Sequence, residues 1–582
     1  MGTVRQFAIV FQIDRNLKLE GPRRTLLQVR TLSEHLWRSR TILPGLFLVV
    51  ICLFAVHPLS DSDQFYHLKV GQVIWETKSV PMYDIFTYTA PGVRWITHEW
   101  LAELVFYWAF LLGGHWGPIY LVAVMAALTM WLLYALAVEW GADRGIGALL
   151  IFLLGYLTLD WWLVRPQVFA YLSFALLIYA LERHRRSHRH AYLYAGVLTV
   201  WFWANVNASF ILGLVVIGLY GTLALLRKYV LHVFREGTNP GTPLAFGLAF
   251  AGATAMSLVN PNGYQVFLYS WYIQPVVKVI RIFEWQPILN YVGDPHIQLL
   301  VSLLLLGNLF AVFWFGVRRE SRDLVWLGLT LGIGVMPFIS VRHYPFWPLA
   351  ITVPFLVGVS SALSKFLGRM ERVWIYPLIL AFGVFALCAR VSAFPGFSVQ
   401  QDPLPVLGAH FASRIGLQGP RFNLYDDGGY LIWQSWPQEK VFIDGRSEIF
   451  AGGPVQEFMD ILNDSPNWDA LVNDKYHINY FFLAYRPETV GRRVMPLVGK
   501  LISQRWALVY WDDSTLIYVR KTPQNEALIR QYALYYVSPF REASTITPGE
   551  IPAAKENLQK ALAVAPHSQV LRNYCAQLPG GC

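Results

Sequence analysis

Charged residues are scarce in this chain of 582 residues: Asp, Glu, Lys and Arg make up only 14%, and apolar residues make up 55%. A soluble protein of this length cannot bury so much apolar surface, and the mean hydropathy is +0.39. Many windows of the sequence approach the ~20 apolar residues that a membrane-spanning helix needs. The scarcity of charge therefore excludes an ordinary soluble protein and predicts a polytopic α-helical membrane protein.

Cysteine is also scarce, and the motifs of several common enzyme classes are missing. The chain has four cysteines and no CxxC pair or similar metal-ligand spacing. It has no G-x-G-x-x-G or P-loop, so nothing supports nucleotide binding, and its His-Glu-Trp sequence at 98–100 is not the HExxH of zinc proteases. Cys575 and Cys582 would pair only in an oxidising compartment, so their pairing stays open.

Basic residues give the chain a net charge of +10, but their placement does not indicate a nucleic-acid-binding surface. They gather in short loops between apolar runs, which is the pattern of cytoplasmic loops in membrane proteins. Placing every basic loop on one side divides the chain into about eleven membrane-spanning helices. The basic clusters are the N-terminal tail, 183–189, 227–228, 318–322 and 365–372. The expected spans are 42–56, 118–138, 145–160, 167–182, 191–204, 209–226, 243–258, 298–317, 324–340, 345–362 and 374–391.

The distribution of apolar runs and basic loops divides the chain into four expected regions. Residues 1–41 form a basic cytoplasmic tail without an early apolar core or cleavage site, so the first span is expected to be retained. Residues 42–391 form the membrane domain, whose first outer loop is 58–117. Residues 392–535 alternate short β-like and helical runs and predict an extracytoplasmic α/β domain. Residues 536–582 form a helical tail like half of a tetratricopeptide (TPR) repeat, which we expect to cap that domain. The expected strands are 422–425, 440–443, 480–484, 507–511 and 515–519, with helices near 403–416, 454–474 and 488–503.

One apolar run, 100–112, is too short to cross the ~30 Å hydrocarbon core comfortably. Counting it as a span would also move every later basic loop to the opposite side of the membrane. We therefore expect an amphipathic helix in the outer interface, with Glu103 on its water-facing side. A short tilted span is the alternative.

Ionisable residues concentrate in the first outer loop, directly after the first span. Charged groups at the edge of a membrane are costly, so their presence there indicates a functional site. Two carboxylates open the loop, and further acidic residues and histidines follow. They are Asp61, Asp63, His67, Asp84, His98 and Glu99.

Polar motifs at the ends of later helices fall on the same expected side of the membrane. Each motif alone is compatible with a helix cap, a turn or an interfacial anchor. Their shared side predicts a polar outward-facing cavity, roofed by residues 58–98. The motifs contain Asp160 and Arg165, Asn205 and Asn207, Asn260 and Asn262, Glu284 and Trp285, and Arg342 and His343.

Several of these residues have simpler local interpretations. Asp61 and Asp63 are suited to capping the helix that is expected directly after them. Arg165 precedes a proline and would serve as an interfacial anchor at a helix start. In the α/β region, the sequence around Asp444 and Arg446 favours a strand-end turn with an internal ion pair over a sugar or phosphate site.

Three stretches of the first outer loop resemble a known family. They read D-S-D-x₃-HL-x₂-G-x₂-I, P-x₂-D-x-F-x-YT and W-x₂-HEWL, and the later GGYLIW and FIDGR motifs fit the same pattern. The first helix, the Asp-bearing loop, the interfacial helix and the multi-span bundle over 42–391 resemble the GT-C superfamily of glycosyltransferases, and more narrowly a bacterial subgroup of it. The resemblance implies an enzyme that takes a sugar from a polyprenyl phosphate and works on the outer face.

The resemblance also implies roles for individual residues. An acidic residue early in the first outer loop accepts the acceptor proton in GT-C enzymes, which maps onto Asp61, or Asp63 as second choice. The two carboxylates would suit one shared Mg²⁺ or Mn²⁺ ion. Asp84 and Glu99 are further acidic candidates. The expected phosphate-binding residues are Arg165, Arg342 and His343, and His67 and His98 would position the acceptor or bind the metal.

The sequence therefore predicts a hexosyl or pentosyl transferase of the bacterial inner membrane with a periplasmic C-terminal domain. Its partners would be a polyprenyl-phosphate-linked sugar and membrane lipids, and not nucleic acid. Two alternatives stay open. A flippase for lipid-linked glycans would carry charged residues deep within several spans. A non-catalytic assembly protein would depend on its C-terminal domain and tail rather than on Asp61 or Arg342.

Overall fold

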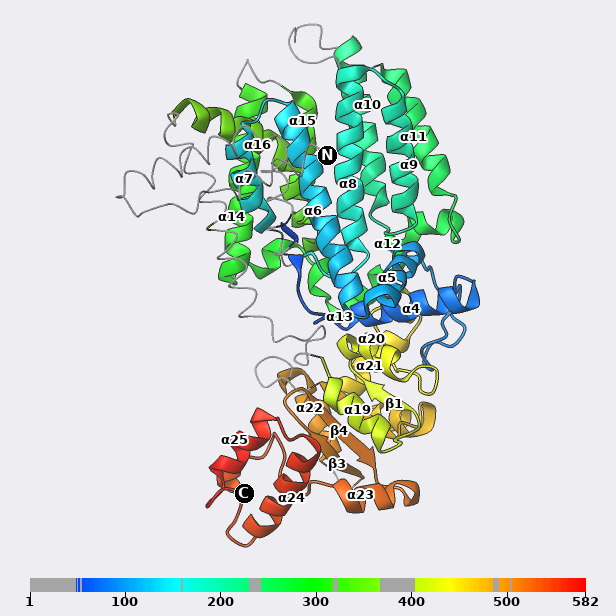
Figure 1. Cartoon of the computed structure of the whole chain (residues 1–582). Coiled ribbons are helices and arrows are strands. Elements are labelled where there is room, and N and C mark those ends of the chain that lie inside the picture. Colours follow the sequence, from blue (N-terminus) through cyan, green and yellow to red (C-terminus); the bar gives the residue numbers. More distant parts are fainter. Residues whose placement is uncertain are drawn as a thin grey trace, which may run out of the picture.

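The computed structural model of the chain describes residues 55–156, 158, 161–229, 242–317, 323–366, 404–484, 491–502 and 505–582, and the isolated residues 49, 51, 52 and 381. Figure 1 shows a helical bundle joined at one end to a smaller part formed by the C-terminal residues. Some predictions concern residues outside these ranges. They are the tail 1–41, most of the span 42–56, the span 374–391, the loop 318–322, most of the loop 365–372, and Asp160.

The bundle consists of helices that follow the predicted apolar runs closely. Helix α9, for example, covers the predicted range 191–204. Leu248 and Leu306 are more than 60% exposed although they lie in bundle helices, as expected for side chains that face lipid. The helices are α6 (Trp116–Glu139), α7 (Arg144–Tyr156), α8 (Gln167–Ser187), α9 (Ala191–Ala204), α10 (Phe210–Tyr229), α11 (Pro243–Ser257), α14 (Pro295–Ala311), α15 (Leu324–Val335) and α16 (Phe346–Phe366).

Length and apolar composition identify three of the described helical segments as able to cross a membrane: Trp116–Glu139, Pro295–Val317 and Val341–Leu363. Five further apolar helices are shorter, among them α9 and α11. A membrane protein is therefore supported, and the number of eleven spans stays a prediction.

Two helices lie across the end of the bundle that faces the C-terminal part (Figure 1). They are α4 (Asp63–Thr77) and α5 (Trp100–Gly113), which pack against each other. At ~1.5 Å per residue, α5 is about 21 Å long and shorter than the hydrocarbon core. The prediction that Glu103 faces water is wrong: its side chain is 1% exposed, because α4 covers that face of α5.

The C-terminal part is built on a sheet of four strands in the order β1-β2-β4-β3. β1 (Arg421–Asn423) pairs parallel with β2 (Tyr480–Ala484), and β4 (Thr515–Arg520) is antiparallel to both β2 and β3 (Trp506–Trp511). Nearly every strand residue is buried, so helices cover both faces, which explains the continuous apolar runs. The helices are α19 (Val406–Arg414), α20 (Gly428–Ser435), α21 (Pro454–Leu462), α22 (Gly491–Leu501) and α23 (Glu526–Tyr532).

The predicted strand at 440–443 is not part of this sheet. Val441 instead makes an isolated parallel bridge with Thr87 of the first outer loop. Its N–H donates to the Phe86 carbonyl (3.1 Å), and its carbonyl accepts from the Tyr88 N–H (3.3 Å). A short apolar run predicts extended backbone but not its partner, and here the partner comes from a loop more than 350 residues earlier.

The tail forms two helices, α24 (Ile551–Val564) and α25 (Gln569–Gln577), which pack against each other, and Tyr574 of α25 contacts the ring of Trp511 in β3. The Asp513 carboxylate, in the β3–β4 turn, accepts from the Ser568 hydroxyl (3.1 Å) and from the N–H of Val570 (2.7 Å) at the start of α25. Cys575 and Cys582 form a disulfide. These contacts are those of a helical pair that covers one edge of the α/β region.

Candidate active site

Three carboxylates meet around one arginine at the end of the bundle. Arg165, just before α8, makes ion pairs with Asp61 through Nε, with Asp63 at 3.3 Å and with Glu284 at 2.8 Å. These side chains keep between 19% and 27% of their surface exposed, so the cluster is accessible. Arg165 is therefore more than an interfacial anchor, because it neutralises part of an acidic site.

Capping of α4 accounts for one oxygen of Asp61, which accepts from the N–H of the first helical residue, but not for the Asp63 carboxylate. The N-cap residue is Ser62, whose side chain makes no capping hydrogen bond; its hydroxyl accepts from the Tyr430 N–H (2.8 Å) of the C-terminal part. Asp61 Oδ1 accepts from the Asp63 N–H (3.1 Å), so both of its carboxylate oxygens are engaged once the Arg165 pair is counted. Asp63 is the first residue of α4 and directs its carboxylate toward Arg165.

Two short 3-10 turns bring Glu284 and Arg342 to the same place. They are Phe283–Trp285, which follows the short helices α12 (Tyr269–Tyr272) and α13 (Gln274–Ile280), and Val341–His343, which precedes α16. The Ser340 hydroxyl donates to the Glu284 carbonyl (2.8 Å), which ties the two turns together. Arg342 lies over the Trp285 ring at 5.0 Å and approaches Glu284 at 3.8 Å.

A cavity of about 290 Å³ opens beside this cluster. Arg342 and His343 line it together with Tyr269, Gln167 and Gln274. His343 Nδ1 is buried and has no hydrogen-bond partner among the described residues. Among the described residues, the Arg342 guanidinium has one ion pair, the long contact with Glu284, so N–H groups remain available to an anionic ligand.

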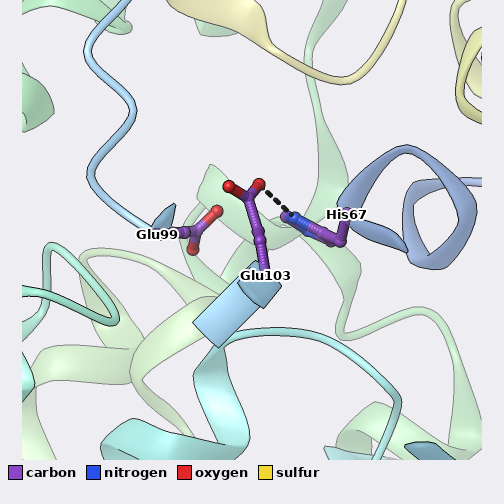
Figure 2. Close-up of side chains that lie close together, drawn as sticks. All are labelled: His67, Glu99 and Glu103. Carbon is purple, nitrogen blue, oxygen red and sulfur yellow. Dashed lines mark hydrogen bonds and ion pairs between the residues drawn. The ribbon is translucent and has the colours of Figure 1, made fainter. Parts of the chain in front are cut away.

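A second group of titratable residues lies where α4 meets α5. His67 Nδ1 and Glu103 Oε1 are 2.9 Å apart, and Figure 2 shows Glu103 between His67 and Glu99. Glu99 accepts from the Asn207 amide (2.8 Å) and lies 3.6 Å from His98 Nε2. Tyr269, which lines the larger cavity, packs on the His98 ring with the ring centres 3.8 Å apart, so the two groups adjoin.

Burial shifts the titration of several of these groups. It raises the pKa of the Asp63 carboxyl to about 8, although the positive charge of Arg165 acts in the opposite direction. It lowers the pKa of His67 to about 4, so this imidazole is neutral at physiological pH. Burial also disfavours ionised Glu99, but the charge and hydrogen bond of His98 outweigh it and lower the pKa of Glu99 to about 2.

The C-terminal part completes the wall of the site through glycines. A Cβ at Gly429 would overlap the Ser62 carbonyl, and one at Gly445 would overlap the Asp63 carboxylate. These glycines belong to the GGYLIW and FIDGR motifs, and α20 packs on α4. The motifs thus allow the backbone of the C-terminal part to lie directly on the Asp61–Asp63 segment.

Asp84 has a different environment from the other acidic candidates. Its carboxylate accepts from the Thr87 N–H (3.1 Å) and lies 2.8 Å from Arg446 Nη2. Arg446 also forms the predicted internal pair with Asp444 at 2.6 Å, and all three side chains are buried. Asp84 therefore fixes the first outer loop to the C-terminal part, and its contacts do not include the Arg165 cluster.

Most outer-face motifs converge as the sequence indicates. Arg165, Asn207, Glu284, Arg342 and His343 all lie at or beside the two groups described above. Asn260 and Asn262 instead form a local turn. The side-chain oxygen Oδ1 of Asn260 accepts a hydrogen bond from the backbone N–H of Asn262 (2.8 Å). Sequence reasoning missed the burial of Glu103 and the contact of Gly445 with Asp63. Only the glycine-rich motifs gave a sequence signal for the contact of Gly445 with Asp63.

No protein-family model matches the chain, and no curated protein matches it. Solved structures do. Archaeal oligosaccharyltransferase AglB from Archaeoglobus fulgidus, in complex with an inhibitory peptide and a dolichol-phosphate, has TM-score 0.51 at 13% identity, over 82% of this chain and 74% of that chain. The apo form of the Archaeoglobus fulgidus oligosaccharyltransferase has TM-score 0.52 at 12% identity, over 83% and 75%. ArnT from Cupriavidus metallidurans in the apo state has TM-score 0.46 at 11% identity, over 82% and 97%. The likeness to the oligosaccharyltransferase shows a shared fold.

Proposed function

We propose that this chain, a membrane protein with the fold of the GT-C superfamily, is a glycosyltransferase that moves a sugar from a polyprenyl-phosphate donor to an acceptor. The observation that carries the proposal is the accessible Asp61–Asp63–Glu284 cluster around Arg165, beside a cavity with an available arginine. Transfer from a lipid phosphate needs both a carboxylate that accepts a proton and a cation that stabilises the departing phosphate. The fold is shared with an oligosaccharyltransferase solved with a dolichol-phosphate.

Among the carboxylates, Asp63 is best suited to accept the proton. Both oxygens of Asp61 are engaged, by Arg165 and by the Asp63 N–H, whereas Asp63 makes a single ion pair, at 3.3 Å, with the residues that the structure describes. The raised pKa of Asp63 also makes its carboxylate a stronger base than an ordinary aspartate. We therefore assign the base to Asp63 and a positioning role to Asp61, which reverses the order that the sequence favoured.

Arg342 is the better of the two candidate phosphate ligands. Arg165 is saturated by three carboxylates, whereas Arg342 lines the cavity with one long contact to Glu284. In the reaction, an acceptor nucleophile attacks the anomeric carbon with inversion, and the bond from that carbon to the phosphate oxygen breaks. The proton of the nucleophile passes to Asp63, and the polyprenyl phosphate leaves as an anion held by Arg342.

A divalent cation shared by Asp61 and Asp63 does not fit these contacts well. The guanidinium of Arg165 already lies against both carboxylates and would be repelled by a cation between them. We therefore derive no step through an ion at that position.

The proposed orientation places the site on the outer face of the membrane. Arg165 stands at the start of α8, and the basic sequence that includes Arg183, Arg185 and Arg186 stands at its other end. At ~1.5 Å per residue, the two ends are about 30 Å apart, which is the thickness of the hydrocarbon core. The positive-inside rule puts the basic end in the cytoplasm, and hence the site and residues 404–582 on the periplasmic side of a bacterial inner membrane.

Transfer by the purified protein tests the proposal. Detergent-solubilised chain is incubated with labelled polyprenyl-phosphate hexoses and pentoses, and sugar released from the lipid is measured. Asp63→Asn is expected to lower kcat at least ~100-fold, the usual scale for loss of a general base. Asp469→Asn is the matched control, because Asp469 is an aspartate with 58% exposure in the C-terminal part. Unchanged turnover in Asp63→Asn would remove the assignment of the base.

A further inference from the structure

Helices α4 and α5 bring three metal-ligating side chains to one point. His67 lies on α4, and Glu99 and Glu103 are spaced by four residues at the start of α5, so both glutamates project from the same face. Gly71 lies one turn after His67, and a Cβ there would overlap the Glu103 carbonyl. The glycine therefore lets the two helix backbones approach closely enough for His67 to reach the glutamates (Figure 2).

The geometry of these side chains fits a single ion. One ligand atom from each of His67, Glu99 and Glu103 lies within 4.8 Å of the others. Bonds of about 2.0–2.2 Å to Zn²⁺ place ligand atoms up to ~4.4 Å apart, so a small side-chain movement closes the set. All three residues are 9% exposed or less, and ligands held by two packed helices are already ordered.

Two further observations point to a ligand at this place. Glu103 Oε2 is buried and has no hydrogen-bond partner among the described residues, and in Figure 2 this oxygen lies on the side of Glu99. A small cavity of about 20 Å³ adjoins it, lined by Glu99, Glu103 and Glu448. A space of roughly 10–15 Å³ holds one water molecule, so the cavity has room for one water ligand.

The charges around the cavity also favour a cation. Three glutamates line it beside His98 and Arg446, and the Arg446 guanidinium is already paired with Asp84 and Asp444. In the described part of the chain, the ion pairs of the glutamates are those of Glu99 with His98 and of Glu103 with His67. Buried carboxylates without a compensating charge are costly, and a divalent ion would supply that charge.

We propose that His67, Glu99 and Glu103 bind a divalent transition-metal ion, Zn²⁺ or Mn²⁺, with a water molecule from the adjoining cavity as a further ligand. An imidazole ligand selects against Mg²⁺ and Ca²⁺, which prefer sites made only of oxygen atoms. The ion would replace the His67–Glu103 hydrogen bond with two metal bonds and lock α4 to α5. The site does not depend on the proposed transferase activity, and its ligands do not include Asp61 or Asp63.

Metal content measured without any activity assay tests this site. The full chain, stripped with a chelator, is dialysed against Zn²⁺ or Mn²⁺, and bound metal is determined by mass spectrometry. Wild type is expected to hold about one ion per chain and to gain thermal stability from it, because binding is linked to folding. His67→Gln and Glu103→Gln should lose both effects. Glu76→Gln, an exposed glutamate on the same helix, is the matched control and should keep them.

Three results would overturn the proposal. The first is no binding above background by wild type. The second is unchanged binding by folded His67→Gln or Glu103→Gln. The third is loss of the ion in Asp61→Asn or Asp63→Asn with retention in the His67 and Glu103 variants. If those two variants fail to fold, wild type loaded with Co²⁺ still decides: visible absorption typical of nitrogen and oxygen ligands supports the site, and its absence contradicts it.

Discussion

Replacing Gly445 with alanine tests whether the C-terminal part holds the proposed base in position. Gly445 follows Asp444, which is fixed by its buried pair with Arg446, so its backbone cannot move away easily. A Cβ at this position would lie 2.9 Å from Asp63 Cγ and closer still to Oδ1. Ordinary contacts of this kind begin at 3.4 Å, so Asp63 must shift.

The size of the effect follows from that overlap. The Oδ1 atom is the closest to the added Cβ and has to move by about 1 Å, and a 1 Å misplacement of a reacting group can reduce a rate ~100-fold. We therefore expect a drop in kcat of about 10- to 100-fold. Overpacking of one methyl group costs about 1–3 kcal/mol, so the protein should stay folded with a modestly lower Tm.

The assay is transfer from a polyprenyl-phosphate sugar, with Tm measured on the same samples. Gly452→Ala is the matched control, because a Cβ at Gly452 would meet nothing within 4 Å. This control should keep wild-type kcat and Tm. Full activity in folded Gly445→Ala would refute the reasoning, because it would mean that the contact with Asp63 does not position the base.

Two further predictions follow from the site. If Asp63 must be ionised to accept a proton, its raised pKa makes kcat/KM rise with pH through about 8 and level off above it, and Asp63→Asn should lose that rise; a flat pH profile in wild type would contradict the assignment. Arg446→Ala leaves Asp84 and Asp444 buried together without their cation and should lower stability by about 3–5 kcal/mol, measured by denaturant unfolding of the solubilised chain. Lys475→Ala removes an exposed ion pair and should change stability by less than about 1 kcal/mol, and equal effects of the two substitutions would contradict the structural role of Arg446.

Hydropathy alone predicted the bundle well because lipid-facing and buried helix positions both require apolar side chains. Helix α9 covers the predicted range, and α11 ends one residue before the predicted end at 258. The likeness to the oligosaccharyltransferase shows that the chain shares the fold of that protein. The convergence of Arg165, Glu284 and Arg342 was also predictable, because helices that cross a membrane in alternate directions return their ends to the same face.

Contacts between distant segments were not predictable. Glu103 was expected to face water because a lone amphipathic helix directs its charged face outward, and nothing in α5 itself shows that α4 covers it. The run at 440–443 has the composition of a sheet strand, but its partner is the first outer loop. Nothing in the GGYLIW motif itself shows that the Ser62 backbone requires a glycine at Gly429. In each case the deciding neighbour lies far away in the sequence.

Binding of a polyprenyl-phosphate sugar to the purified chain tests the central claim most directly, with wild type, Arg342→Ala and Asp63→Asn compared side by side. Loss of charge-assisted hydrogen bonds to a phosphate, worth about 1.5–3 kcal/mol, predicts binding weakened roughly 10- to 100-fold in Arg342→Ala. Asp63→Asn should bind the donor as wild type does and fail only in transfer. Absence of binding by wild type would contradict the account and favour a non-catalytic assembly protein.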